Sequence, residues 1–271
     1  MTTISFLDFL KLGNESSYHF RNILIKSYIS TFGPLGINAK IRSSHLINAI
    51  YRHERITGYK NLKVLDAGCG LAYTDFFLAG KYPNWKIKGI DANTEVIEKN
   101  VKLSNYLGLT NLEFEKKSIE DIYDRDCYDI IISADVLEHI YEDVMALQKL
   151  RNAIQKNGLL ILHLPLNRHL CSRIIPFFKP IVMEDHVREE YTLEDILDKL
   201  RQTYFHPIEV GYSYSWKGEL AYELNYLFIR DAFLRRVFAV LFHFPSNLLG
   251  YLDSKSIHSK GNSIVIVAKP K

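Results

Sequence analysis

The stretch Val64-Leu65-Asp66-Ala67-Gly68-Cys69-Gly70 decides the fold of this chain. It predicts a short buried strand that runs directly into a tight turn, and a helical pattern follows from about Tyr73. Gly68 and Gly70 lack Cβ, so they can adopt positive φ and allow a ligand to approach the backbone. The helix behind them would present unpaired N–H groups at its N-terminus. The sequence therefore predicts a ligand-binding unit of strand, loop and helix.

An acid occupies the position of the first glycine of a nicotinamide-binding loop. Such loops use a G-x-G-x-x-G pattern to place a pyrophosphate on the helix N-terminus, whereas this loop reads Asp66-x-Gly68-x-Gly70-x-Ala72. A carboxylate there would repel a pyrophosphate and attract an amino group. Asp91 ends the next predicted strand, where a carboxylate can accept both hydroxyls of a ribose. The pattern favours a cationic nucleoside such as S-adenosylmethionine, and a generic turn of a doubly wound sheet is the alternative.

Three motifs in this order resemble the class I S-adenosylmethionine-dependent methyltransferases, and within them the branch of the ubiquinone-biosynthesis O-methyltransferases. The motifs are Val64 to Gly70, then Gly89-Ile90-Asp91-Ala92-Asn93, then Tyr128-Asp129-Ile130-Ile131-Ile132-Ser133-Ala134-Asp135-Val136-Leu137-Glu138-His139-Ile140. The resemblance runs from about Asn61 to Tyr191, roughly half of the chain. It implies S-adenosylmethionine as methyl donor, S-adenosylhomocysteine as product, and N-terminal helices that lie over the cofactor.

The resemblance also implies the residues of the cofactor site. The backbone N–H of Ile119 would meet a ring nitrogen of the adenine, and Ser118 would meet the exocyclic amine, where many relatives have Asp. The expected site residues lie at or just beyond the ends of predicted strands or in the glycine loop, and they are Asp66, Gly68, Gly70, Asp91, Ala92, Ser118, Ile119 and Ser133.

The remaining pattern predicts an α/β fold, a doubly wound, Rossmann-like, seven-stranded sheet with helices on both faces. Strands are expected near 62–66, 86–91, 112–116, 128–133, 158–163, 205–214 and 263–269, and helices near 18–31, 40–55, 73–82, 94–107 and 141–155. Thr94 and Thr192 are expected N-caps, and Asn157-Gly158 is an expected C-cap. We expect a helical cap over 1–60 and a methyltransferase domain over 61–271, with a helical insertion at about 216–255.

Glu219 to Phe244 forms a long apolar helical stretch within that insertion. Its charged residues interrupt every window long enough to span a bilayer. The apolar surface must therefore be covered. The N-terminal helices, a second subunit of a homodimer, and a membrane surface are the three candidates.

His139 is the first candidate for the base that removes a proton from the acceptor, because it follows the fourth strand and imidazole titrates near neutral pH. His186 and His163 are weaker candidates. Asp135, Glu138 and His139 share one face of a helical turn, and in some relatives the matching residues bind a divalent ion. A solvated helix start explains them better than a metal site does, and we expect no metal.

The composition of the chain limits the size of its core, its partners and its location. Hydrophobic residues make up 47% and charged residues 24% of the chain, which suffices for a full core. The net charge of +3 is too small to indicate a nucleic-acid partner. Three cysteines without metal-binding spacing suit a reducing compartment. The N-terminus lacks the features of a signal peptide, so we expect a cytoplasmic protein, with peripheral membrane contact left open.

The sequence favours an S-adenosylmethionine-dependent methyltransferase that acts on a small hydrophobic or aromatic acceptor by in-line transfer to oxygen or nitrogen. Three alternatives remain open at this level. They are a non-catalytic scaffold that binds the cofactor, a methyltransferase acting on a membrane lipid, and a nicotinamide-dependent oxidoreductase, which Asp66 argues against.

Overall fold

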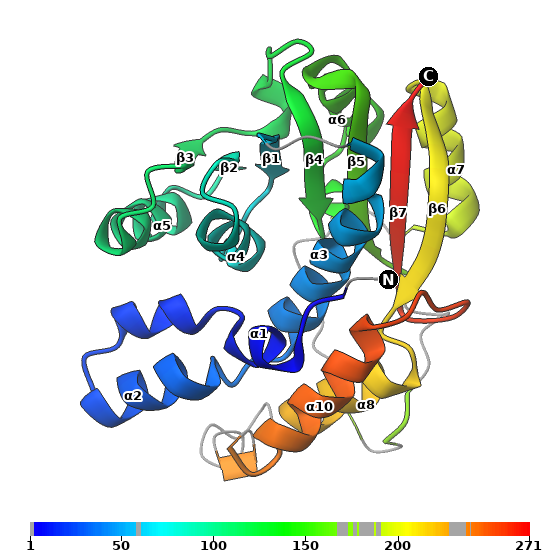
Figure 1. Cartoon of the computed structure of the whole chain (residues 1–271). Helices are drawn as coiled ribbons and strands as arrows, with labels where there is room; N and C mark the ends of the chain where they lie inside the picture. The colour runs from blue at the N-terminus through cyan, green and yellow to red at the C-terminus, as the bar shows by residue number, and fades with distance from the viewer. Residues whose placement is uncertain are drawn as a thin grey trace.

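The structure is a computed structural model that describes residues 3–57, 61–166, 173–175, 178, 187, 191–227, 237–238 and 240–271. Its centre is a seven-stranded sheet in the order β3-β2-β1-β4-β5-β7-β6, in which β7 alone runs antiparallel to its neighbours (Figure 1). The order reverses between β1 and β4, and ligands of such sheets bind at the carboxyl ends of the strands near this point. The strands are β1 (Lys63–Ala67), β2 (Lys86–Asp91), β3 (Leu112–Lys116), β4 (Tyr128–Ala134), β5 (Ile154–Pro165), β6 (Phe205–Ser213) and β7 (Ser263–Pro270).

Helices cover both faces of the sheet, because alternate residues of the central strands point to opposite sides. Ile131 of β4 packs with the helices α6 (Asp143–Ala153) and α7 (Leu193–Gln202). Its neighbours Ile130 and Ile132 pack on the other face. That face is covered by the helices α3 (Asn38–Thr57), α4 (Tyr73–Lys81) and α5 (Thr94–Leu107). The predicted doubly wound α/β fold is confirmed.

Two predicted helix ends are wrong. Helix α6 ends at Ala153 because β5 begins at Ile154, so Asn157-Gly158 lies inside a strand rather than at a C-cap. The N-cap of α5 is Asn93 rather than Thr94, because the Asn93 side chain accepts hydrogen bonds from the backbone N–H groups of the first turn. Thr192 caps α7 as predicted, within a capping box closed by Asp195.

A layer of helices lies beyond the carboxyl ends of the parallel strands, and both ends of the chain contribute to it (Figure 1). We call this layer the cap. It contains α1 (Phe6–Lys11), the 3₁₀ helix η1 (Asn14–His19), α2 (Ile23–Phe32), α8 (Trp216–Tyr226) and α10 (His243–Ser254). The two segments share one apolar cluster, so the insertion packs on the N-terminal helices, the first of the three predicted alternatives. Its buried members are Ile4, Phe9, Leu12, Ile37, Ile41, Ile47, Tyr51, Tyr214 and Ala221.

The helix predicted over Glu219–Phe244 has different bounds in the structure. Helix α8 ends at Tyr226, and α10 begins at His243 and continues to Ser254. Pro245 falls in the first turn of α10, where proline is tolerated because no intrahelical N–H is needed. No helix in the described ranges is long and apolar enough to cross a bilayer.

Buried polar contacts join the two ends of the chain within the cap. The Lys40 ammonium donates to the carbonyl of Leu10 at 2.8 Å and to Oδ1 of Asn247 at 2.9 Å. Burial lowers the pKa of Lys40 to about 7. The cap is therefore held by specific hydrogen bonds as well as by its apolar cluster.

Asp253 of α10 makes several of these buried polar contacts. Its buried carboxylate accepts hydrogen bonds from the backbone N–H groups of Tyr214, Ser215 and Gly218 at 3.0, 2.9 and 3.2 Å. Nε2 of His45 from α3 lies 3.0 Å from its Oδ2. One side chain thus ties α10 to α3 and to the segment that connects β6 with α8.

Candidate functional site

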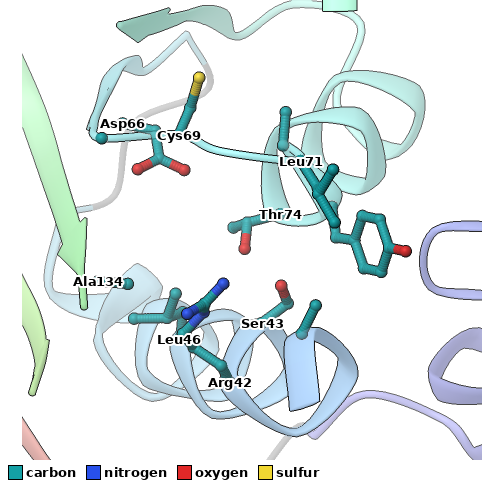
Figure 2. A pocket seen from close by; sticks show the side chains of 12 residues that line it. Arg42, Ser43, Leu46, Asp66, Cys69, Leu71, Thr74 and Ala134 are labelled. Atoms are coloured by element: carbon teal, nitrogen blue, oxygen red, sulfur yellow. The ribbon is translucent and has the colours of Figure 1, made fainter. Parts of the chain in front are cut away.

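A cavity of about 20 Å³ lies between α3 and the loop that follows β1. Figure 2 shows Arg42, Ser43 and Leu46 of α3 on one side, and Asp66 and Cys69 on the other. The loop and the helix that covers it therefore form the two walls of the site. Helix α3 belongs to the N-terminal segment that was expected to lie over the cofactor, and it lies beside the glycine loop.

The loop has the backbone conformation that its glycines predict. Gly68 and Gly70 have φ of 92° and 49°. A Cβ on Gly68 would lie 2.3 Å from Cγ2 of Val136, so this position excludes a side chain. A Cβ on Gly70 would meet nothing within 4 Å, so open space adjoins the backbone there. Gly68 is needed for packing, and Gly70 leaves room for a ligand to approach.

Asp66 is buried next to the last residue of β1, Ala67, and lines the cavity. Within the described ranges its Oδ1 is buried and has no hydrogen-bond partner. Burial raises the pKa of Asp66 to about 7, although the positive charge of Arg42 acts in the opposite direction. An unpaired carboxylate oxygen beside open loop backbone fits the amino group of S-adenosylmethionine, so the residues present suit this cofactor.

Asp91 lies at the end of β2, beside the same loop. Its Oδ2 accepts a hydrogen bond from the N–H of Gly70 at 3.0 Å, and its Oδ1 accepts one from Asn93 at 2.8 Å. These bonds fix the carboxylate, and each oxygen keeps a lone pair for a ribose hydroxyl. Ala92 is exposed next to it.

The other expected cofactor residues lie along the same edge. Lys116 of β3 pairs with Asp91, which brings Ser118 and Ile119 just beyond the end of the neighbouring strand. Ser118 donates to the Glu120 carboxylate at 2.9 Å, and Ile119 is buried. Ser133 of β4 is buried, and its Oγ has no partner in the part of the chain that the structure describes. The structure thus brings the predicted set together at one sheet edge.

A chain of polar side chains extends from the cavity toward β6. Nη1 of Arg42 donates to Oδ2 of Asp135 at 2.6 Å. Nδ1 of His163 lies 2.6 Å from Oδ1 of Asp135, and Nε2 lies 2.8 Å from Oγ of Ser213. Burial would raise the pKa of Asp135, but His163 and Arg42 outweigh it and hold this pKa well below its usual range. The four residues form one charged, hydrogen-bonded wall.

The predicted catalytic histidines lie in different environments. His139 is half-buried at the end of the 3₁₀ helix η3 (Leu137–His139), directly after β4. His163 is buried between Asp135 and Ser213, which leaves no open face for a substrate. His186 lies outside the described residues.

The alternative of a metal site gains no support from the geometry. Among the residues that the structure describes, no group of three or more His, Cys, Asp or Glu side chains is placed to hold an ion. Asp135, the first of the suggested ligands, is instead bonded to Arg42 and His163.

Sequence reasoning missed Arg42 and Asp75. Arg42 belongs to α3, whose interior face carries the buried polar residues Lys40, Ser44 and His45. Polar residues on the inner face of this helix were the sequence feature that could have indicated a role for Arg42. Asp75 is fully buried in the first turn of α4, next to Asp66, where a typical helix start would explain an acid equally well.

Comparison with known proteins gives a consistent result. A family model described as a methyltransferase domain matches residues 59–208. The chain is 31% identical over 157 residues to the mitochondrial ubiquinone biosynthesis O-methyltransferase of Candida albicans, covering 57% of this chain and 45% of that protein. It is 28% identical over 131 residues to (S)-coclaurine N-methyltransferase of Thalictrum flavum subsp. glaucum, covering 47% and 34%. The matches therefore span less than half the length of these two curated relatives.

A solved structure extends the likeness beyond the matched segment. An S-adenosylmethionine-dependent methyltransferase from Clostridium acetobutylicum superposes with a TM-score of 0.55 at 13% identity, covering 85% of this chain and 91% of that chain. At this identity the comparison shows the fold alone.

Proposed function

Because the chain belongs to the class I S-adenosylmethionine-dependent methyltransferases, we propose that it transfers a methyl group from S-adenosylmethionine to a small acceptor. The observation that carries the proposal is the buried, unpaired Oδ1 of Asp66, a residue that lines the cavity together with Gly68 and Cys69 of the glycine loop. Asp66 would hold the amino group of the cofactor, and Asp91 its ribose. Ser118 and Ile119 would hold the adenine.

The cofactor supplies an electrophilic methyl group on a sulfonium. An acceptor lone pair forms a bond to the methyl carbon while the carbon–sulfur bond breaks, so the product is S-adenosylhomocysteine. The protein has to align the acceptor opposite the sulfur, and alignment supplies much of the rate. When the acceptor is a hydroxyl or a protonated amine, a base must also take its proton, and His139, half-buried just after β4, would be that base.

Aromatic side chains support an aromatic or hydrophobic acceptor. The ring centroids of Tyr214 and His163 are 6.3 Å apart, and Tyr222 lies 6.5 Å from Tyr214. Tyr226 and Phe178 lie 4.9 and 5.6 Å from Tyr222. The row leads from the polar wall into the cap, and a flat apolar acceptor would stack on its partly exposed members, Tyr222 and Tyr226.

One surface feature favours an acceptor that is held in a membrane. Ile23 and Leu24 of α2 and Leu241 and Phe244 beside it are each more than half exposed. The Phe32 and Phe244 rings, 5.8 Å apart, join the two helices, and no Asp or Glu occurs from Ser16 to His53. Exposed apolar residues with only basic neighbours suit a surface of anionic lipid.

This second candidate is tested by sedimentation with lipid vesicles. The protein should sediment with vesicles that contain phosphatidylglycerol and less with phosphatidylcholine alone. Leu24→Glu should lower the bound fraction, whereas Leu107→Glu, an exposed apolar position on α5, should leave it unchanged. Equal loss in both variants, or no sedimentation of the parent protein, would contradict membrane docking by this face.

The proposed function itself is tested by isothermal titration with S-adenosylmethionine and S-adenosylhomocysteine. Micromolar binding of both ligands is expected, with the product at least as tight. Absence of heat from folded protein would refute the assignment, and quenching of NADH fluorescence would then favour an oxidoreductase. Transfer of labelled methyl to a panel of phenols and amines separates an enzyme from a scaffold that only binds.

A further inference from the structure

Two buried carboxyl groups lie together behind the glycine loop. Asp75 is fully buried and Asp66 is 5% exposed. Neither oxygen of Asp75, nor Oδ1 of Asp66, receives a hydrogen bond from any other group that the structure describes. The two side chains are neighbours, because Asp66 pairs with Gly89 across β1 and β2 and a Cβ on Gly89 would lie 3.1 Å from Oδ2 of Asp75. Ionised carboxylates only accept hydrogen bonds, so contact between them requires a proton on one of the two.

The surroundings decide which of the two carries the proton. Asp75 faces the interior, where Gly89 and the ring of Phe114 adjoin it: a Cβ on Gly89 would lie 3.1 Å from Oδ2 of Asp75 and 2.7 Å from Phe114. Asp66 faces the cavity, where Arg42 from α3 stabilises a negative charge and Asp91 opposes one. Burial raises the pKa of Asp75 well above its ordinary value. The neutral form therefore belongs to the deeper residue.

We propose that Asp75 stays protonated and donates a hydrogen bond to Asp66, which holds the Asp66 carboxylate ionised and oriented toward the amino group of the cofactor. This rests on the proposed function of the site. Asp75 is a positioning residue, because it acts through Asp66 and does not itself touch the cofactor. The pair then carries a single negative charge, which matches a single ammonium group.

The arrangement has a consequence for pH. Cofactor binding needs ionised Asp66, whose pKa in the folded protein is about 7. Affinity should therefore rise as the pH increases toward 7, by up to about tenfold per pH unit below that value, and level off above it. The loss of the hydrogen bond from Asp75 should move this transition to higher pH.

The test is titration of S-adenosylmethionine between pH 5.5 and 8 into the parent protein and two variants of Asp75. Asp75→Asn keeps a neutral donor of the same shape, so its affinity should stay within about twofold and its pH profile should coincide with that of the parent. Asp75→Leu removes the donor, so affinity at pH 7 should fall about tenfold or more, with the transition about one unit higher. The ligand's own amino group titrates alike in every sample and cancels in the comparison.

Asp66→Asn is the control: it should bind about tenfold or more weakly than the parent at pH 8, and its residual affinity should not rise between pH 5.5 and 7. A changed profile in Asp75→Asn would overturn the proposal, since it would mean that Asp75 is ionised in the parent. An unchanged profile in folded Asp75→Leu would overturn it as well. If Asp75→Leu does not fold, Asp75→Asn alone decides. Failure of the parent protein to bind at any pH would instead refute the proposed function.

Discussion

Asp253 offers the sharpest test of how the cap is held together. Asp253→Ala removes a buried carboxylate that accepts three backbone hydrogen bonds and contacts His45. Each buried donor left without a partner costs about 1–3 kcal/mol, and three buried backbone N–H donors lose their acceptor in this variant. We therefore expect the free energy of unfolding to fall by about 3–5 kcal/mol, a large share of the roughly 5–15 kcal/mol typical of a folded protein.

Urea unfolding followed by circular dichroism measures this loss. Asp198→Ala is the matched control, because Asp198 is an exposed acid paired with Arg201 on the surface of α7. Its removal should change the free energy of unfolding by less than about 0.5 kcal/mol. Similar losses in the two variants would refute the role given to Asp253.

The pH dependence of the same variant has a defined sign. Burial would raise the pKa of Asp253, but His45, Ser215 and His258 outweigh burial and lower it. A carboxyl with a lowered pKa stabilises the folded state above its unfolded pKa of about 3.9, and this stabilisation is lost as the pH falls through the folded value. The difference between the parent protein and Asp253→Ala should therefore be full near neutral pH and shrink in acid.

Three further predictions concern the site. Gly68→Ala should destabilise the protein more than Gly70→Ala, because both positions have positive φ but only a Cβ on Gly68 would also collide with Val136. Gly70→Ala should in addition lose cofactor affinity. Thermal melts and titrations separate the two effects, and equal melting points would contradict the packing argument. Asp91→Ala should weaken S-adenosylmethionine binding about tenfold or more with little change in melting temperature, and unchanged affinity in calorimetry would remove Asp91 from the site. His139→Ala should lower kcat while cofactor affinity stays nearly constant, and equal turnover in mutant and parent would exclude His139 as the base.

The fold was largely predictable from sequence because its elements are specified locally. The strand that contains Asp66, the loop glycines and the strand that ends in Asp91 each follow from a short pattern of apolar residues and turn signals. The error at Asn157-Gly158 has the same origin, since these residues commonly end a helix. They belong to β5 because the residues on both sides of them, Ile154 and Leu159, pair with β4. Local patterns therefore positioned the glycine loop and Asp91 correctly.

The rest of the site depends on contacts between distant segments. Arg42 reaches Asp135 across 93 residues, and His163 reaches Ser213 across 50. Nothing near Arg42 in the sequence indicates its partner. Asp75 is close to Asp66 in sequence, but only the packing of α4 onto the sheet shows that no other group satisfies its carboxyl. Arg42 and Asp75 were missed because their roles depend on burial and on pairing between distant segments. The periodicity of a sequence shows neither.

The cap is built from both ends of the chain, and this constrains the order in which the molecule can fold. Lys40 bonds to Asn247 and His45 to Asp253, separations of 207 and 208 residues, and β7 enters the sheet between β5 and β6. Contacts between such distant segments form slowly, because a long chain must close before they gain any stability. During synthesis, α3 must wait for residues 243–270 before its packing is complete. We therefore expect a nascent chain to build the β1–β4 half of the sheet early and to acquire a competent pocket late.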